Sequence, residues 1–217
     1  AKALTPDPLD LSVPRVAAIC VYGDRVADAK AALGDSGIKV AAVATAFPSG
    51  RASLAVKLQD TDDAVAAGAD EIDMVIDRGA FLAGRYGQVF DEIVAVKAAC
   101  GQAHLKVILE TGELQTYDNI KRASWIAMLA GADFIKTSTG KTPVSATAEA
   151  ARVMLETIRA SGKKVGFKAS GGIRSFEDAK LYLDLCDKIM GADWATPETF
   201  RFGASGLLDA LLERLNA

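Results

Sequence analysis

The chain has 217 residues, of which 50% are hydrophobic, 24% charged and only 6% aromatic, and its formal net charge is -3 at pH 7. This length is enough for one sizeable core, and the charged fraction is that of a folded chain rather than a disordered one. The net charge is negative and the sequence shows no stripe of basic residues, which excludes a dedicated nucleic-acid-binding protein. No apolar run is long enough to cross a membrane, so we expect a single domain over residues 1–217 without a membrane partner.

The few cysteine and histidine residues restrict the compartment and the chemistry. Cys20, Cys100 and Cys186 are too few and too scattered for a disulfide framework, which predicts a reducing, cytoplasmic location. Cys20 could line the mouth of a site, whereas core packing is expected for the other two cysteines. His104, the single histidine, is expected in a surface turn. A zinc site of several imidazoles is therefore excluded, and a Ser-His-Asp triad is disfavoured.

Short apolar or β-branched runs alternate with longer stretches of helical period along the whole chain. In chain order, the expected strands are Val16–Tyr22, Lys39–Phe47, Glu71–Ile76, Leu105–Glu110, Phe134–Ser138, Val165–Ala169 and Arg201–Ala204. The helices expected after them are Asp24–Leu33, Ser53–Ala67, Gln88–Cys100, Tyr117–Ala130, Thr147–Ala160, Phe176–Met190 and Leu207–Leu215. This alternation predicts an α/β fold with a parallel sheet of βαβ units, covered on both faces.

An open doubly wound sheet and a closed (β/α)₈ TIM barrel both fit this alternation, and two features favour the barrel. No strand is followed by the glycine-rich turn of a dinucleotide site. A Gly-Ala-Asp triplet also starts at Gly68, recurs after 63 residues at Gly131, and recurs after 60 more at Gly191. Two βα units of about 30 residues give that period, and recurrence at alternate strands is natural in a barrel.

The strand count falls one short of the eight that a TIM barrel needs. We therefore expect seven parallel strands with exposed strand edges, and a first β/α unit that lies upstream of Ala1. The alternative is an unrecognised strand in the proline-rich start, which contains Pro6, Pro8 and Pro14 and has the composition of a loop.

Four charged residues interrupt the apolar strands: Asp73, Lys106, Lys136 and Lys168. Buried charges are costly unless they are paired, so four of them need a common explanation. One explanation is a structural ion network inside the barrel. The other is a catalytic site, since Lys136 and Lys168 lie on consecutive strands.

Two neighbouring lysines suit chemistry on a carbonyl group. An ordinary lysine has a pKa near 10.4, so only about 0.04% of it is free amine at pH 7. Burial and a second cation lower the pKa of the nucleophilic lysine, because both disfavour its ammonium form. The pair therefore points to Schiff-base formation, with Asp73 available to transfer protons through a water molecule.

Glycine-rich loops follow the last two strands and predict a phosphate site. Ser170-Gly171-Gly172 follows one strand, and Gly203-Ala204-Ser205-Gly206 leads from the other into a helix. Glycines let backbone N–H groups approach an anion, and a helix N-terminus adds its dipole. The alternative is that these glycines only form tight turns. Gly140-Lys141-Thr142 resembles the end of a P-loop, but Ile135 replaces the first glycine of that motif, so only Lys141 is retained as a phosphate contact.

The chain resembles the deoxyribose-phosphate aldolase family over nearly its whole length, from about Val16 onward. The resemblance is carried by Ala18–Tyr22, Glu71–Asp73, Lys106–Leu114, Phe134–Lys141, Gly166–Gly172 and Arg201–Ser205. It implies a class I aldolase, a carbon–carbon lyase on a TIM barrel, without a metal or other cofactor. Such an enzyme reversibly cleaves 2-deoxy-D-ribose 5-phosphate to D-glyceraldehyde 3-phosphate and acetaldehyde.

The resemblance also implies roles for individual residues. Lys136 would form the Schiff base, Lys168 would tune it and Asp73 would relay protons. The positions that would contact the sugar phosphate and its phosphate group are Gly140, Lys141, Gly171, Gly172, Gly203 and Ser205. Homodimers are common in this family, so a homodimer is a possible assembly.

The chain departs from the family pattern at three places. It lacks the first strand with its Asp-x-Thr motif, it has Gly206 where a second serine is frequent, and it ends in Asn216-Ala217 rather than in a tail with a terminal tyrosine. Two other functions stay open from sequence. One is a different sugar-phosphate aldolase or isomerase on the same barrel, and the other is an inactive sugar-phosphate-binding regulator.

Overall fold

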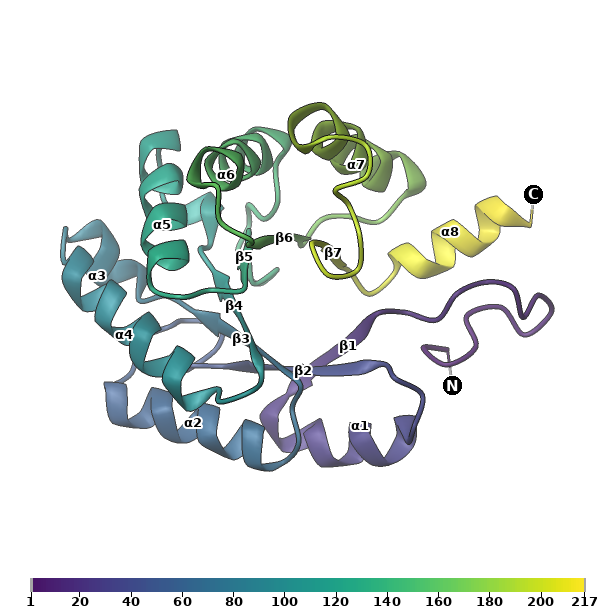
Figure 1. Ribbon diagram of the computed structural model, residues 1–217, viewed down its shortest axis with the longest axis horizontal. Helices are drawn as coiled ribbons and strands as arrows, with labels where there is room; N and C mark the ends of the chain where they lie inside the picture. The colour runs from purple at the N-terminus through teal and green to yellow at the C-terminus, as the bar shows by residue number, and fades with distance from the viewer. Residues whose placement is uncertain (1, 217) are drawn as a thin grey trace.

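The computed structural model describes residues 2–216, which form one seven-stranded parallel sheet surrounded by helices (Figure 1). The strands are β1 (Ala18–Tyr22), β2 (Lys39–Ala44), β3 (Glu71–Val75), β4 (His104–Ile108), β5 (Phe134–Lys136), β6 (Gly166–Ser170) and β7 (Phe200–Gly203). The helices are α1 (Val26–Leu33), α2 (Leu54–Ala66), α3 (Arg78–Leu82), α4 (Tyr86–Ala99), α5 (Tyr117–Leu129), α6 (Ala148–Ser161), α7 (Phe176–Met190) and α8 (Leu207–Leu215).

The strands follow one another in space in their order along the chain, from β1 to β7. This is the order of a β/α barrel and not of a doubly wound sheet, in which the order reverses. The expected fold class and strand number are therefore confirmed. Within residues 2–216, β1 and β7 are the edge strands and do not pair with each other.

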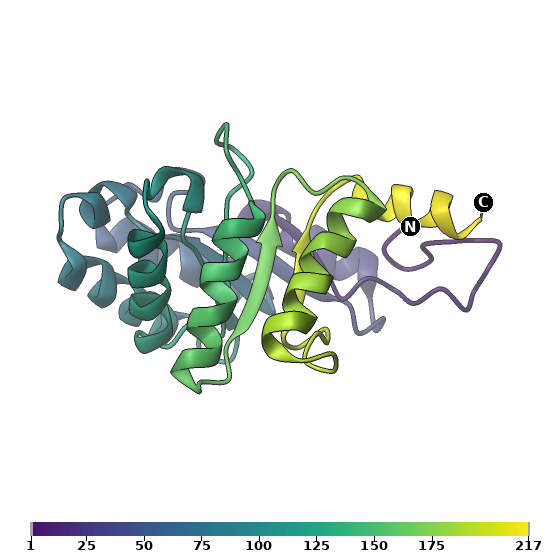
Figure 2. The same cartoon turned by 90° about the horizontal axis from the view of Figure 1, so that it is seen from above.

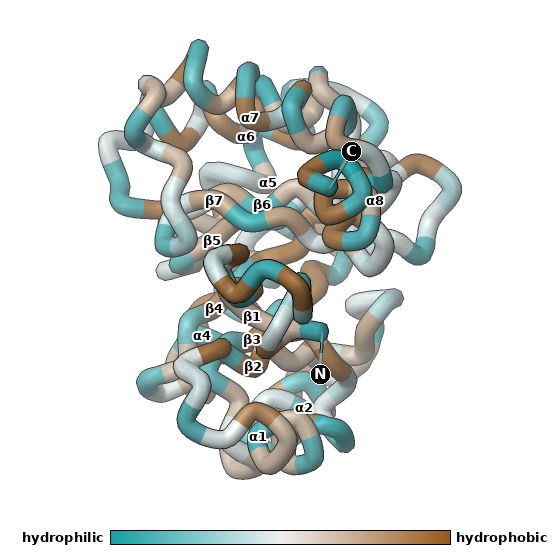
Figure 3. The backbone as a smooth tube through the Cα atoms, turned by 90° about the vertical axis from the view of Figure 1, so that its right-hand side faces the viewer, coloured by the Kyte–Doolittle hydropathy of each residue, from teal (hydrophilic) through white to brown (hydrophobic). Residues whose placement is uncertain are grey.

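The helices cover the outer side of the curved sheet and bury its apolar residues. Figure 3 shows hydrophobic segments concentrated in the strands, while hydrophobic and hydrophilic segments alternate along the outer helices. Polar side chains cap the N-termini of α2, α5, α6 and α7, where Ser53, Thr116, Thr147 and Ser175 each accept a backbone N–H of the first turn. Phe167 of β6 is fully buried and packs against Phe200 of β7. Burial of one such ring stabilises the fold by about 1.5–3 kcal/mol.

The Gly-Ala-Asp repeat has a structural cause. Gly68 and Gly131 have positive φ angles of 101° and 99°, which permit the sharp turn from helix to strand. The aspartate of each triplet then binds the backbone of the preceding strand. Asp70 accepts the N–H of Val40 at 2.8 Å, and Asp133 accepts that of Leu105 at 2.7 Å. The repeat therefore ties alternate strands to their neighbours, although Gly191 repeats the turn with an exposed Asp193 after it.

Several expected boundaries were wrong, mainly at the carboxyl ends of strands. β2 ends at Ala44 rather than Phe47 because Thr45 and Ala46 adopt left-handed φ angles of 63° and 58°. The strand expected to end at Glu110 ends at Ile108, since Glu110 has a φ of 57°. β5 and β7 also end earlier than expected, at Lys136 and Gly203, whereas β6 begins and ends one residue later than expected, at Gly166 and Ser170.

Two further expectations need correction. The short helix α3 was not expected between β3 and α4, although the Asp77 side chain begins it by accepting the N–H of Ala80 at 2.8 Å. His104 is exposed, as expected, but it is the first residue of β4 rather than part of a turn.

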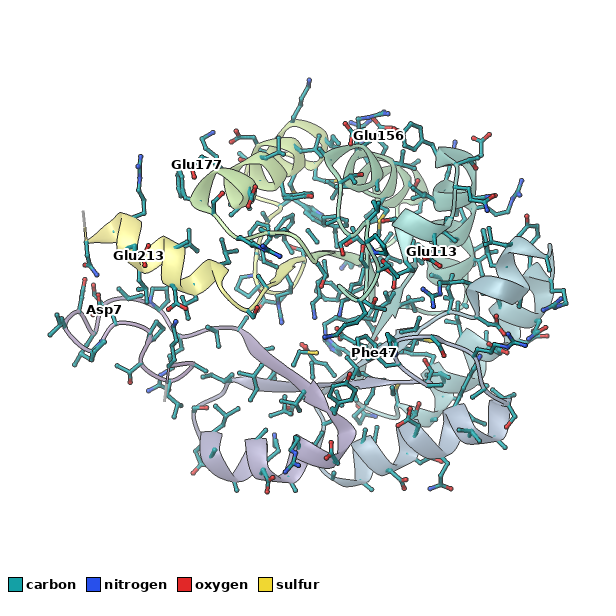
Figure 4. All side chains as sticks on the ribbon, turned by 180° about the vertical axis from the view of Figure 1, so that it is seen from behind. Asp7, Phe47, Glu113, Glu156, Glu177 and Glu213 are labelled. Atoms are coloured by element: carbon teal, nitrogen blue, oxygen red, sulfur yellow. The ribbon has the colours of Figure 1, made fainter. Side chains whose placement is uncertain are left out.

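The two ends of the described chain lie side by side next to the open edge of the sheet (Figures 1 and 2). Asp7 in the N-terminal segment and Glu213 on α8 lie on the same side of the molecule (Figure 4). A hydrogen bond of 3.0 Å from Asn216 Nδ2 to Asp7 Oδ2 joins the two segments. Among residues 2–216, no helix is both long and apolar enough to span a membrane.

Candidate active site

The four charged strand residues converge inside the curved sheet. Asp73 of β3 lies opposite Lys106 of β4 in the strand register, and Lys136 of β5 lies opposite Lys168 of β6. All four are buried, with at most 6% of each residue exposed. Because side chains alternate between the two faces of a strand, this register sends all four to the inner face. The structure therefore brings together the three residues with expected catalytic roles.

Asp73 holds the centre of this cluster. Its Oδ2 accepts hydrogen bonds from Lys136 Nζ and from Lys168 Nζ, both at 2.7 Å. Its Oδ1 accepts a third from Lys106 Nζ at 3.0 Å. A fully buried carboxylate is stable only with such partners, and here one carboxylate serves three lysines. Two lysine nitrogens therefore lie within reach of a single proton-accepting oxygen.

The surroundings shift the pKa values of these groups in different directions. Burial lowers the pKa of Lys136, the neighbouring Lys168 ammonium lowers it further, and Asp73 opposes both only in part. Burial also lowers the pKa of Lys168, but Asp73, Cys20 and Glu71 together outweigh it, so that the pKa of Lys168 is raised overall. Burial would raise the pKa of Asp73, yet Lys106, Lys136 and Lys168 together hold it well below its usual value. Lys136 is thus the lysine that gives up its proton more easily, and Lys168 stays an ammonium ion.

Lys106 belongs to a structural layer beside the site. Its Nζ also donates to Glu71 Oε2 at 2.5 Å, and Glu71 Oε1 lies 3.4 Å from a guanidinium nitrogen of Arg201 on β7. This row of alternating charges links β3, β4 and β7 across the inner face. The ion-network interpretation therefore fits Lys106, whose Nζ contacts two carboxylates, those of Glu71 and Asp73. Sequence reasoning missed Glu71, although it lies two residues before Asp73 and so on the same strand face.

The glycine-rich loops lie at the same end of the sheet, above the lysines. The N–H of Gly171 donates to the carbonyl of Gly203 at 3.3 Å, which places the two predicted phosphate loops side by side. Gly171 and Gly172 have positive φ angles of 85° and 83°. A Cβ on Gly171 would come within 3.1 Å of the Cα of Gly140, so all three loops approach closely there. Such crowding explains why glycine is required at position 171.

The other expected residues lie partly along a cavity and partly in the loop after β5. The cavity, of about 680 Å³, lies between the edge strands β1 and β7 and is lined by Lys168, Arg201, Ser205 and Cys20, among others. The Sγ atom of Cys20 lies 3.9 Å from Asp73 Oδ2. Ser205 precedes α8, whose N-cap residue Gly206 offers no side chain to the first-turn N–H groups. Lys141 is exposed in the loop after β5, next to Gly140.

A parallel β/α sheet of barrel type with a lysine-rich centre at its inner face defines the class of the molecule, a barrel enzyme. More narrowly, the chain belongs to the DeoC/LacD aldolase family, whose model matches residues 2–212.

Individual relatives agree with this family. The chain is 54% identical to the deoxyribose-phosphate aldolase of Agrobacterium fabrum over 201 residues, which cover 92% of this chain and 77% of that protein. It is 51% identical to the human deoxyribose-phosphate aldolase over 198 residues, which cover 88% of this chain and 62% of the human one. A crystal structure from Coccidioides immitis, provisionally described as a deoxyribose-phosphate aldolase, aligns with a TM-score of 0.80 at 34% identity and covers 90% and 73% of the two chains.

Replacing Asp73 by Asn is expected to lower the free energy of unfolding at pH 7 by about 3–5 kcal/mol, because it leaves buried ammonium groups without a counter-charge. Without Asp73, burial lowers the folded-state pKa values of Lys136 and Lys168 below their unfolded ones, so the stability of the variant rises with pH between pH 7 and pH 9. In the wild type, the lowered pKa of Asp73 contributes stability that is present above its ordinary value of 3.8 and is lost as the pH falls below it.

Urea unfolding at pH 7 and pH 9 measures both effects, with Asp193→Asn, a change at an exposed aspartate, as the control. An Asp73→Asn variant as stable as the control at both values would contradict the electrostatic account.

Proposed function

We propose that the protein is a class I aldolase that reversibly cleaves 2-deoxy-D-ribose 5-phosphate to D-glyceraldehyde 3-phosphate and acetaldehyde. The observation that carries this proposal is the position of Asp73 Oδ2, at 2.7 Å from both Lys136 and Lys168. The opposite directions of the two lysine pKa shifts support it, since one lysine must be an amine and the other a cation.

The proposed reaction begins at Lys136. Its amine attacks the C1 aldehyde of the open-chain sugar, and loss of water gives an iminium ion. A base then removes the proton of the C3 hydroxyl, the C2–C3 bond breaks, and its electron pair moves into the iminium to give an enamine. D-glyceraldehyde 3-phosphate leaves, the enamine is protonated at C2, and water releases acetaldehyde and the free amine.

Asp73 and Lys168 support these steps in the proposed mechanism. Asp73 relays protons through a water molecule, because its carboxylate stays ionised and contacts both lysines. Lys168 keeps the pKa of Lys136 low by disfavouring a second positive charge beside its own. An Asp73→Asn variant should therefore turn over slowly and still form some imine.

The proposed phosphate site uses Gly171, Gly172, Gly203 and Ser205, with Gly140 and Lys141 from the loop after β5. Backbone N–H groups of the glycine loops and the N-terminus of α8 favour an anion at this point. Lys141 adds a positive charge that an exposed side chain can bring to the phosphate.

Replacing Ser205 by Asp is expected to raise KM for the phosphorylated substrate roughly tenfold, because the new carboxylate repels the phosphate. KM for unphosphorylated 2-deoxyribose should stay nearly unchanged, and Ser205→Ala, which removes only the hydroxyl, should have the smaller effect. Initial rates with both substrates measure this. An unchanged KM for the phosphorylated sugar would place the phosphate elsewhere.

The most direct assay couples glyceraldehyde 3-phosphate release from 2-deoxyribose 5-phosphate to its oxidation by an added dehydrogenase. Release of that product is the expected result. Phosphate-ester binding without product would favour a binding protein, and isomerised sugar phosphate would favour an isomerase on the same fold.

Four broader statements are also proposals. A single barrel domain over residues 1–217 is supported by the one sheet, and a location in the cytoplasm by the three unpaired cysteines. A role in deoxyribose phosphate catabolism follows from the proposed cleavage reaction. A homodimer stays a prediction, for which light scattering of the purified protein is the test.

A further inference from the structure

Glu110 is a buried residue in an unusual backbone conformation. It follows β4 with φ and ψ angles of 57° and 60°, in the left-handed region that residues other than glycine, asparagine and aspartate rarely adopt. None of its surface is exposed. Such a conformation costs free energy and persists only where the surroundings hold it in place. The side-chain contacts of Glu110 show what holds it.

The carboxylate of Glu110 binds the loop that follows β5. Its Oε1 accepts the N–H of Thr139 and the hydroxyl of Thr142, both at 3.2 Å. Its Oε2 accepts the Thr139 hydroxyl at 2.5 Å. The oxygen of that hydroxyl in turn accepts the backbone N–H of Lys141 at 3.1 Å. Two hydrogen bonds therefore connect the Glu110 carboxylate to the backbone of Lys141.

Other contacts hold the loop after β4 against the loop after β5. A Cβ on Gly112 would overlap the carbonyl oxygen of Val144, so the loop after β4 lies directly against the loop after β5. On the other side, Arg78 of α3 lies 3.5 Å from Glu110 Oε2 and donates to the carbonyl of Ser49 at 3.1 Å. The glutamate is thus fixed between α3 and residues 138–147.

We propose that Glu110 is a positioning residue that shapes residues 138–147 and so holds Lys141 where it meets the phosphate of the substrate. Through this loop, Glu110 sets the preference for phosphorylated over unphosphorylated aldehydes. The inference rests on the proposed function, because it takes the sugar phosphate as the ligand of Lys141. Glu110 itself does not touch the reacting atoms, since Thr139 stands between it and Lys141.

The test replaces Glu110 by Gln, which keeps the shape of the side chain but turns one acceptor into a donor that faces the donors of Thr139 and Thr142. Hydrogen bonds to a charged group are lost, so KM for 2-deoxyribose 5-phosphate should rise roughly tenfold. KM for 2-deoxyribose and kcat for both substrates should change by less than about twofold, because Lys136 and Lys168 are untouched.

Glu113→Gln is the matched control. Glu113 lies 3.5 Å from the same arginine, Arg78, but its side chain is 44% exposed. Figure 4 shows it in the segment that follows β4. Its variant should keep both KM values. An equal rise of both KM values in Glu110→Gln, or a loss of kcat with unchanged KM, would overturn the proposal in favour of a merely structural role.

A second pair of variants tests the proposal even if Glu110→Gln misfolds. Thr139→Val removes the hydroxyl between Glu110 and Lys141, and Thr139→Ser retains it. The valine variant should show the same selective rise in KM, and the serine variant should stay near the wild type. Equal KM values for the two would overturn the proposed route through Thr139.

Two measurements do not depend on turnover and separate this inference from the proposed function. Amide hydrogen exchange of residues 138–147 should be faster in Glu110→Gln than in the wild type and in Glu113→Gln. Inorganic phosphate, titrated by calorimetry, should bind the variant more weakly. If the wild type fails to cleave 2-deoxyribose 5-phosphate, the proposed function fails while these two results still decide the role of Glu110. Unchanged exchange and unchanged phosphate affinity would overturn that role.

Discussion

A Lys136→Leu variant is expected to lose activity by a factor on the order of 10⁴ to 10⁶, the size of effect seen when an enzyme loses its nucleophile. Leucine fills much of the buried space of Lys136, which is only 4% exposed, but offers no amine to the aldehyde. Without that amine, no iminium ion forms and the C2–C3 bond has no acceptor for its electrons. Borohydride treatment in the presence of substrate should therefore leave the variant unlabelled.

The control for this variant is Lys163→Leu, which removes an exposed lysine before β6 and should label like the wild type. Thermal unfolding of both variants shows whether the fold is retained. Retained labelling and activity in a folded Lys136→Leu variant would mean that another amine, with Lys168 the nearest candidate, forms the imine.

A Lys168→Leu variant is expected to keep the nucleophile, Lys136, but to change the pH dependence of activity. The Lys168 ammonium lowers the pKa of Lys136, and both nitrogens lie 2.7 Å from the same oxygen of Asp73. Its removal raises the pKa of Lys136, so less free amine is present at pH 7. The acidic limb of the pH–rate profile should move to higher pH by about one to three units, the range that a neighbouring charge produces at this separation.

Activity of Lys168→Leu should then fall at pH 7 and recover in part as the pH rises. Lys168→Arg keeps the positive charge and should leave the acidic limb near that of the wild type. A limb that stays in place in Lys168→Leu, or moves to lower pH, would contradict the tuning role.

The central parts of the helices and strands could be predicted from the sequence, because the spacing of apolar residues and their burial determine these parts. Strands such as β2, in which Val40–Ala44 are apolar and buried, are recognisable as apolar runs. The carboxyl ends of β2 and β4 were not recognised, because Thr45, Ala46 and Glu110 adopt left-handed angles without a glycine or asparagine to signal them. The five-residue helix α3 was also missed, since it is too short for a helical period and contains Gly79.

The candidate site could be predicted from the sequence to a similar extent. Asp73, Lys136 and Lys168 are conspicuous because they interrupt apolar strands, and a parallel sheet with sequential strand order must bring them together. Glu71 could have been found from its spacing of two residues from Asp73. Glu110 and Arg78 could not, because their partners come from loops whose conformation depends on tertiary contacts.

The most direct test of the account is to locate the imine in the wild-type protein. The enzyme is incubated with 2-deoxyribose 5-phosphate, reduced with borohydride, digested and analysed by peptide mass spectrometry. The account predicts a single reduced adduct on Lys136, in the peptide that contains Phe134–Lys136, and none without substrate. An adduct on Lys106, Lys168 or any other lysine, or no adduct in a folded and active enzyme, would contradict it.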